Sequence, residues 1–562
     1  METFADLLLA RRDDPRVAVR SDDLTWTWPE LIAAATARAR IMTELRMSDR
    51  PFHVGVLLES TPEYLTWIYG AALARATIVG INPTRRGESL AADIRHTDCQ
   101  LVVTDTARRT LLDGAALGLS DDRTVLVDSR EYSAAIDQAA ASSDELAADA
   151  DADDLLLLLF TSGSTGAPKA VRCTTGRLAT IARAAIANLG MSSADVTYQS
   201  MPMFHGNAIM ANLAPAAALG VPACLRPRFS GSQFLADVRR YDATYFNYVG
   251  RSLAYVLATP ERPDDAENSL RSGFGTEASL RDREEFSRRF GCELIERYGS
   301  SEGVITTHRP ADTPPASIGA PAPRPGTDVA VVDPQTGREC ATAIFDEVGR
   351  LVNAAEAIGE LVDRSGAGTF EGYYRNEEAM NTRLRGGWYW SGDLAYRDAD
   401  GFLFFAGRSN DWLRVDSENF AAAPVETILA RLPGTVMTAV HAVPDSRTGD
   451  QVMAVFELAA GATFDPASFG SFLACQADLG TKWAPRFVRI VAAMPLTATN
   501  KVDKAPLRAS AWATADPVYW RAGAALDYER FDAVTRADLE ADFARHGRDH
   551  LLPIGEPLPG AG

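Results

Sequence analysis

The chain has 562 residues and a formal net charge of −19, with 46% hydrophobic and 23% charged residues, ordinary values for a globular protein. This length predicts two or more domains, and the acidic balance argues against a nucleic-acid-binding surface. The longest apolar run, residues 155–160, is as long as a buried strand and far too short to span a membrane. With no basic-then-apolar secretory signal at the N-terminus, we expect a cytoplasmic enzyme.

The first part of the chain alternates short apolar runs with helical patterns. Residues 54–58, Thr77–Gly80 and Leu101–Thr104 are typical of buried strands, and Pro62–Ala74 and Gly87–His96 between them are typical of helices. This alternation favours a parallel sheet with helices on its faces.

Composition changes mark the later divisions of the chain. The acidic, Ala- and Ser-rich segment 139–154 predicts a surface linker, after which strands and helices alternate again to about residue 280. Loops rich in Pro and Gly at 310–330 lead into a small β-rich part, and an α+β stretch follows it. The aromatic residues of the last fifty positions predict docked helices rather than a floppy tail.

We therefore expect an α/β fold with a large N-terminal domain and a small α+β C-terminal domain, which the family resemblance given below implies is mobile. The predicted parts are 1–407, 408–512 and an extension of unknown role, 513–562. The six cysteines form no C-x-x-C pair, so we expect scattered, mostly buried thiols rather than a disulfide framework or a zinc site.

The strongest motif follows the apolar run directly: Thr161-Ser-Gly-Ser-Thr-Gly166, then Pro168 and Lys169. Small residues let backbone N–H groups approach phosphate oxygens, and the lysine supplies a positive charge for a polyphosphate. The Walker spacing is absent. A flexible turn is the alternative, but the preceding strand and the final Pro-Lys favour a phosphate loop. Its expected ligand-binding residues are Thr161, Ser162, Gly163, Ser164, Thr165, Gly166 and Lys169.

This string resembles the signature of the adenylate-forming superfamily, which holds acyl- and aryl-CoA synthetases, peptide-synthetase adenylation domains and luciferases. Ala170 stands where the family usually has glycine. The resemblance implies ATP and Mg²⁺ as ligands and a site in the cleft between the two domains.

A second motif, Tyr298-Gly-Ser-Ser-Glu302, resembles the family's Y-G-x-T-E segment. The resemblance implies that Tyr298 packs on adenine, with Gly299 and Ser301 in the nucleotide site. A carboxylate near a triphosphate is repulsive unless a cation lies between them. Glu302 is therefore the candidate catalytic metal ligand, and the Thr161 hydroxyl is a second candidate ligand.

Two further motifs resemble the family's ribose-binding and hinge segments. Asp393 in Tyr-Trp-Ser-Gly-Asp would accept hydrogen bonds from the ribose hydroxyls, and Arg408 would contact ribose or phosphate. Asn410 takes the hinge position, which is usually lysine or aspartate. In the loop that the family uses for thioester formation, Ser417-Glu418 replaces the usual Gly-Glu pair.

The last motif, Pro495-Leu-Thr-Ala-Thr-Asn-Lys501, matches the family's terminal lysine segment. The resemblance implies that Lys501 is the catalytic lysine of adenylation. Lys504 is close but lies three positions too late.

Other segments suggest a branch of the superfamily. Residues 201–205, Met-Pro-Met-Phe-His, resemble a segment that lines the acid pocket, where His205 would orient the carboxylate or gate the tunnel. A structural histidine is nearly as well supported. Residues 245–255 and Gly275-Thr276-Glu277 resemble very-long-chain acyl-CoA synthetases, also called fatty-acid transport proteins, which places Gly275 and Thr276 near adenine. The alternative for the aromatic residues here is plain core.

Together these segments predict an ATP-dependent fatty-acid–CoA ligase, or a ligase for a bulky lipid or steroid side-chain acid, acting through an acyl-adenylate. The small-molecule partners are the carboxylic acid, ATP and coenzyme A, with no nucleic acid and with peripheral membrane contact possible for a lipid substrate. Two alternatives stay open: an acyl-AMP ligase that loads a carrier protein, and a lipid-binding or uptake protein with a degenerate ligase fold. The intact Lys501, Glu302 and Asp393 argue against the second.

Overall fold

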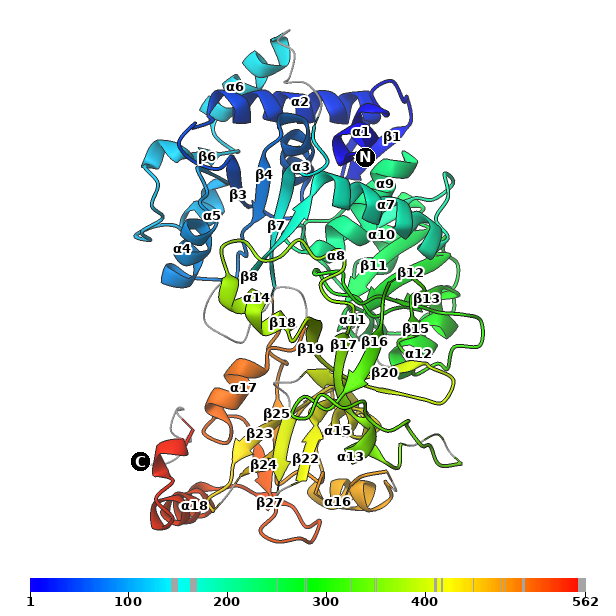
Figure 1. The fold of residues 1–562 in the computed structure, drawn as a ribbon. Helices are drawn as coiled ribbons and strands as arrows, with labels where there is room; N and C mark the ends of the chain where they lie inside the picture. The colour runs from blue at the N-terminus through cyan, green and yellow to red at the C-terminus, as the bar shows by residue number, and fades with distance from the viewer. Residues whose placement is uncertain are drawn as a thin grey trace. The chain divides into compact units, whose positions relative to one another are not determined.

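A computed structural model describes most of the chain (Figure 1), namely residues 1–142, 150–161, 169–249, 251–276, 278, 280–324, 326–347, 349, 351–408, 412–415, 418–447, 449–476, 478–480, 482–497 and 501–553. The chain divides into two units. Unit 1 comprises Met1–Val304 and Thr369–Thr382, and unit 2 comprises Ile305–Gly368 and Arg383–Gly562.

The described strands of unit 1 form two sheets. The six-stranded sheet has the order β6-β5-β3-β4-β7-β8 and is parallel except for the last pair, β7 and β8. Its strands are β3 His53–Leu57, β4 Thr77–Gly80, β5 Leu101–Thr104, β6 Thr124–Leu126, β7 Leu155–Thr161 and β8 Lys169–Thr174.

The seven-stranded sheet has the order β13-β12-β11-β9-β10-β1-β2 and is parallel except for its edge pair, β1 and β2. Its strands are β1 Val17–Ser21, β2 Leu24–Thr27, β9 Thr197–Gln199, β10 Ala223–Leu225, β11 Tyr245–Val249, β12 Ser272–Thr276 and β13 Glu293–Glu296.

Helices connect these strands, as βαβ units require; α2, for example, packs against α3 and α6 (Figure 1). The helical segments of this region are α1 Phe4–Leu9, α2 Trp28–Glu44, α3 Pro62–Ala74, α4 Gly87–His96, α5 Thr106–Arg109, η1 Asp121–Arg123, α6 Arg130–Ala141, α7 Thr175–Leu189, α8 Gly206–Ala208, the π-helical η2 Ile209–Leu213, α9 Ala214–Leu219, α10 Phe234–Tyr241, α11 Arg251–Leu257, α12 Leu280–Phe290 and α14 Glu377–Arg383, which ends at the boundary with unit 2.

Local sequence explains several of these elements. In α3, Pro62 occupies the first turn, where its missing N–H costs nothing, and Arg75 ends the helix in the left-handed conformation at φ 55°. β3, β4 and β5 are buried throughout, as parallel strands covered on both faces must be. The expected parallel sheet with helices on its faces is confirmed.

The acidic segment differs in part from the predicted linker. Residues 139–141 belong to α6, and the buried Ala139 accepts a hydrogen bond from the Arg40 guanidinium through its carbonyl oxygen, at 2.8 Å. Alanine favours helix strongly, so the helical pattern of α6 continues into this stretch. Residues 143–149 lie outside the described part of the chain.

Unit 2 is rich in β-structure. Its described strands form two five-stranded sheets, one containing β16–β20 and the other β23–β27, and two strand pairs. The strands are β14 Thr307–His308, β15 Ala320–Pro321, β16 Val329–Val332, β17 Gly359–Asp363, β18 Leu384–Arg385, β19 Trp388–Arg397, β20 Leu403–Arg408, β21 Trp412–Val415, β22 Glu418–Ala421, β23 Thr435–Pro444, β24 Asp450–Leu458, β25 Phe487–Val491, β26 Val518–Trp520 and β27 Glu529–Arg530. The helical segments are α13 Ala354–Ala357, α15 Ala422–Leu429, α16 Pro466–Ala474, α17 Lys504–Ser510, α18 Ala533–Arg545 and η4 Asp549–Leu551.

The C-terminal residues are docked, as predicted, but they contribute strands as well as a helix. β26 pairs with β25, and β27 extends the sheet further. The Phe531 and Phe543 side chains pack with Phe487 and the fully buried Trp512 in one cluster. The stretch after residue 512 thus shares its core with the stretch before it. The division near Gly407 into a large and a mobile domain stays a prediction.

The described residues contain no helix with the length and apolar character needed to cross a membrane. All six cysteines lie in the described part of the chain and are free thiols. Cys99, Cys173, Cys224 and Cys292 are buried, which confirms the expected mostly buried thiols. Burial raises the pKa of the Cys99 thiol to about 12.

The docking of α18 gives a stability test. Phe543→Ala removes a fully buried ring from the cluster around Trp512, so it should lower the free energy of unfolding by about 3–5 kcal/mol. Val534→Ala, on the same helix, alters a side chain that is 70% exposed and should change it by less than about 0.5 kcal/mol. Urea unfolding followed by tryptophan fluorescence measures both, and equal effects would contradict the docked position of α18.

Candidate active site

The site segments of unit 1 follow the carboxyl ends of parallel strands. β9, β11, β12 and β13 run in the same direction, so their carboxyl ends lie at one edge of the sheet. His205 comes after β9, Thr276 ends β12 and Tyr298 comes after β13. Ligands of open α/β sheets bind at this edge, so the topology gathers segments that are far apart in the sequence.

An arginine fixes the loop that carries Ser301 and Glu302. Nη2 of Arg177, on α7, donates hydrogen bonds to the carbonyl oxygens of Ser301 and Glu302, each at 2.8 Å, and Nη1 donates to the Arg172 carbonyl at 2.7 Å. Gly303 then turns the chain at φ +70°, and a Cβ atom there would lie 2.9 Å from Arg177 Nη2. The guanidinium therefore ties this loop to β8, the strand that follows the expected phosphate loop.

The Glu302 side chain is buried, with 5% of its surface exposed. The Tyr373 hydroxyl donates a hydrogen bond to Glu302 Oε1 at 2.6 Å. In the described part of the chain, no group hydrogen-bonds to the other carboxylate oxygen, Oε2. Glu302 thus presents one occupied and one available oxygen.

Sequence reasoning did not identify Tyr373. It lies in a short segment, residues 370–375, that is joined to β8 by an isolated bridge between Val171 and Tyr373. The only local signal is the pair Tyr373-Tyr374 after Gly372, which by itself indicates nothing about a carboxylate 71 positions away in the chain.

The ends of the expected phosphate loop are adjacent. Thr161, the last residue of β7, is the register partner of Lys169, the first residue of β8. Both side chains are partly exposed. The loop itself, 162–168, which includes Ser162, Gly163, Ser164, Thr165 and Gly166, lies outside the described residues.

The aromatic residues around β11 form core. Phe246, Tyr248, Phe286 and Phe290 belong to one buried cluster, which supports the core alternative for them. Gly275, on the neighbouring strand, packs against the Tyr248 ring: a Cβ atom there would lie 2.3 Å from Tyr248 Cε2. A glycine is therefore required at this position for packing, whatever contact it makes with a nucleotide.

His205 lies at the N-terminal end of α8 and is partly exposed. Its side chain makes no capping hydrogen bond, while its backbone N–H donates to the Pro202 carbonyl at 3.1 Å. A Cβ atom on the adjacent Gly206 would lie 3.4 Å from Ser301 Oγ, so the 201–205 segment ends beside the Glu302 loop. The role of His205 in orienting or gating the acid stays a prediction.

In unit 2, the two residues predicted to hold the ribose are neighbours. Asp393 on β19 is the register partner of Arg408 on β20, although the Arg408 side chain lies outside what the structure describes. The Ser391 hydroxyl accepts a hydrogen bond from the Asp393 N–H at 3.1 Å, and the buried Glu360 carboxylate accepts one from Gly392 N–H at 2.8 Å. Burial raises the pKa of Glu360 despite that bond and the nearby arginines.

The two candidate lysines differ in their surroundings. Lys501 is partly exposed; its N–H donates a hydrogen bond to the Thr497 hydroxyl at 3.2 Å, and the Thr497 N–H donates to the Lys501 carbonyl at 2.7 Å. Lys504 begins α17, and its Nζ forms an ion pair with Glu426 Oε1 at 3.0 Å. The role of Lys501 in adenylation stays a prediction.

Other predicted positions fall outside the described residues. These are Glu277, the hinge residue Asn410, Ser417, and the side chains of Arg414 and Glu418.

Comparison with known proteins identifies the family. Residues 9–374 match the family model described as AMP-binding enzyme, and residues 424–501 match the AMP-binding enzyme C-terminal domain. The chain belongs to the AMP-binding enzyme family. This confirms the adenylate-forming superfamily predicted from the motifs.

Among relatives in the family, the steroid-22-oyl-CoA synthetase of Rhodococcus jostii is 52% identical over 98% of this chain and 99% of its own length. A medium/long-chain fatty-acid–CoA ligase of Mycobacterium marinum is 45% identical, covering 89% of this chain and 94% of that protein. The crystal structure of the anthranilate CoA ligase AuaEII with anthranoyl-AMP shares the fold, with a TM-score of 0.77 and 21% identity over 91% of this chain and 98% of that one.

The carboxylates of this chain suit a magnesium ion that binds together with a nucleotide. No three His, Cys, Asp or Glu side chains of the described residues gather into a metal site of their own. Mg²⁺ is commonly held by one or two carboxylates together with substrate phosphates rather than by an all-protein cage. The buried Glu302 carboxylate, with Oε1 fixed by Tyr373, supplies such a ligand, and the roles of Glu302 and Thr161 stay predictions.

Two glycines of the predicted nucleotide site can be separated by experiment. Gly275→Ala forces a methyl group into the Tyr248 ring and should lower the free energy of unfolding by about 1–3 kcal/mol. Gly299→Ala meets nothing within 4 Å, so stability should be unchanged and any loss of ATP affinity would report nucleotide contact. Urea unfolding and isothermal titration with ATP measure the two effects, and a stable Gly275→Ala variant would contradict the packing described for β12.

Proposed function

We propose that this chain is an ATP-dependent CoA ligase for a steroid side-chain acid, acting through an acyl-adenylate. The observation that carries the proposal is the 52% identity, over nearly the full length of both chains, with steroid-22-oyl-CoA synthetase. A medium- or long-chain fatty acid is the second candidate substrate, favoured by the 45% identity with the fatty-acid–CoA ligase. Both relatives are named for CoA products, which supports CoA over a carrier protein and an enzyme over a lipid-binding protein.

In the first half-reaction, a carboxylate oxygen of the acid attacks the α-phosphorus of ATP. A bond forms between that oxygen and phosphorus, the bond to the bridging oxygen of the β-phosphate breaks, and pyrophosphate leaves. Negative charge accumulates on the phosphate oxygens, and the Lys501 ammonium group would neutralise part of it. We propose that Tyr298 holds the adenine and that Asp393 and Arg408 hold the ribose.

Magnesium is the proposed cation of this step. When bound, it would offset the charge of the triphosphate. Glu302 would hold it through Oε2, and the Thr161 hydroxyl would be a second ligand.

In the second half-reaction, the sulfur of CoA attacks the acyl carbonyl carbon. The carbon–sulfur bond forms, the bond between the carbonyl carbon and the phosphate oxygen breaks, AMP leaves and the thiol proton passes to solvent. No pyrophosphate charge develops in this step, so we propose that Lys501 serves only the first. Because both nucleotides are intracellular metabolites, we propose the cytoplasm as the place of action.

A panel of acids tests the proposed substrate. With ATP, Mg²⁺ and CoA, a steroid whose side chain ends in a C22 carboxyl group should give acyl-CoA and AMP together. Its kcat/KM should exceed that of dodecanoate and palmitate by roughly 10-fold or more, because the pocket discriminates by shape. Chromatography of AMP and acyl-CoA measures both products.

Each other outcome of the panel favours a different function. Faster turnover of the fatty acids would favour the second candidate substrate. Adenylate without thioester would favour a carrier-loading ligase. Binding of acids without ATP consumption would favour a lipid-binding protein.

The roles of the two lysines give a second test. Lys501→Ala should lower ATP–pyrophosphate exchange by at least about 10²-fold, the loss typical of one preorganised electrostatic group, and should spare thioester formation from supplied acyl-adenylate. Lys504→Ala breaks the ion pair with Glu426 and should lower stability while leaving the exchange rate of the folded protein close to normal. Equal loss of both half-reactions in Lys501→Ala would contradict the division of labour.

A further inference from the structure

A short segment, residues 370–375, contacts both β8 and the buried Glu302 carboxylate, and we name it the tyrosine strap. A single antiparallel bridge joins it to β8: Arg172 N–H donates to the Gly372 carbonyl at 3.1 Å, and Tyr374 N–H donates to the Ala170 carbonyl at 2.8 Å. These two bonds fix the position of the strap along β8, which begins directly after the expected phosphate loop.

Side chains fix the strap at the end near residue 371. The Glu371 carboxylate accepts two hydrogen bonds from Thr174, one from the backbone N–H at 2.8 Å and one from the hydroxyl at 2.6 Å. Thr174 also caps α7, the helix that carries Arg177. The strap and the arginine that holds the Glu302 loop are therefore tied to the same residue.

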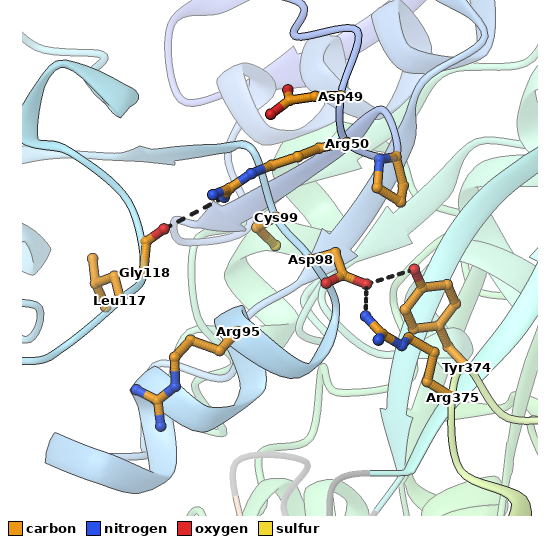
Figure 2. A pocket seen from close by; sticks show the side chains of 10 residues that line it. Asp49, Arg50, Arg95, Asp98, Cys99, Leu117, Gly118, Tyr374 and Arg375 are labelled. Atoms are coloured by element: carbon orange, nitrogen blue, oxygen red, sulfur yellow. Dashed lines mark hydrogen bonds and ion pairs between the residues drawn. The ribbon is translucent and has the colours of Figure 1, made fainter.

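The other end is fixed in a hollow of about 590 Å³ that is lined by residues preceding β3 and β5 (Figure 2). There the Asp98 carboxylate accepts hydrogen bonds from the Tyr374 hydroxyl, at 2.8 Å, and from the Arg375 guanidinium. Although burial acts to raise the pKa of Asp98, these two bonds outweigh it and hold that pKa below its ordinary value. Asp98 is therefore a charged anchor for the strap at neutral pH.

The two tyrosines of the strap contact different carboxylates. The Tyr374 hydroxyl donates to Asp98, while the Tyr373 hydroxyl donates to Glu302. The Tyr373 side chain is buried, 5% exposed, and its ring packs edge-on against Phe370 at 5.0 Å between centroids. The strap therefore allows the Tyr373 hydroxyl little freedom to move.

From this geometry we propose that Tyr373 is a positioning residue for the cation-binding carboxylate. A carboxylate can rotate about the bond to its neighbouring carbon, which tilts the plane that holds its two oxygens. A hydroxyl fixed at 2.6 Å from Oε1 restricts that tilt and so fixes the direction in which Oε2 points. Groups that orient a metal ligand in this way strengthen metal binding. The inference rests on the proposed function, in which Glu302 binds the magnesium ion of Mg·ATP.

Tyr373→Phe tests the proposal, with Tyr374→Phe as the matched control. Each variant loses one hydroxyl from adjacent positions of the strap and keeps its ring. Isothermal titration with α,β-methylene-ATP, first with Mg²⁺ and then with EDTA, gives the factor by which magnesium strengthens nucleotide binding. Tyr373→Phe should reduce this factor by roughly 10-fold or more, whereas Tyr374→Phe should leave it unchanged.

A kinetic measurement distinguishes positioning from general damage. In ATP–pyrophosphate exchange, Tyr373→Phe should raise the Mg²⁺ concentration for half-maximal rate by a similar factor, and the rate at saturating Mg²⁺ should recover to near the normal value. The proposal would be overturned if Tyr373→Phe kept the normal strengthening of nucleotide binding by Mg²⁺ and the normal Mg²⁺ concentration for half-maximal exchange. So would an equal change in both tyrosine variants, because it would indicate loosening of the strap.

Glu302→Gln separates this inference from the proposed function. If Mg²⁺ no longer strengthens nucleotide binding in Glu302→Gln but still does so normally in Tyr373→Phe, only the proposed role of Tyr373 is overturned. Retention in Glu302→Gln would remove Glu302 from the metal site, and the proposed role of Tyr373 would fall with it.

Discussion

The burial of the Glu302 carboxylate is the constraint on which the site in unit 1 depends. A buried carboxylate loses the water molecules that stabilise its charge, so hydrogen-bond donors or a cation must replace that stabilisation. Tyr373 supplies one donor, and the backbone of the loop is fixed by Arg177. Both partners are anchored on β8 or the helix that follows it, so the strand next to the phosphate loop also determines where the carboxylate lies.

Parallel sheets explain how the other candidates come to lie near one another. Because β9, β11, β12 and β13 are parallel, the carboxyl ends of β9, β12 and β13 lie at one edge of the sheet. The side chains after those ends come from segments as distant as His205 and Tyr298. Behind that edge, the Tyr248 ring occupies the space where a Cβ atom at position 275 would lie, so a glycine that resembles a nucleotide contact is also required by packing within the sheet.

Unit 2 shows the same coupling of site and support. Hydrogen bonds join Lys501 to Thr497, and α17 begins three residues later at Lys504, which forms an ion pair with Glu426. The sheet of this unit continues into β26 and β27, and the aromatic cluster around Trp512 joins the C-terminal helix to it. The C-terminal residues therefore belong to the body that carries the catalytic lysine candidate.

The sequence by itself determined the family, the α/β class and several elements. β4, β5, α3 and α4 have the predicted bounds, because hydrophobic periodicity and capping are local properties. Motif order likewise identified Glu302 and Lys501 as candidates, since each motif is a short run of residues.

Only the tertiary structure decided which side chains support those candidates. The Tyr373–Glu302 hydrogen bond, the Lys504–Glu426 ion pair and the Gly275–Tyr248 contact each join positions far apart in the chain. No local pattern encodes them, because a strand's neighbours in a sheet are set by topology and side-chain packing rather than by adjacency in the sequence.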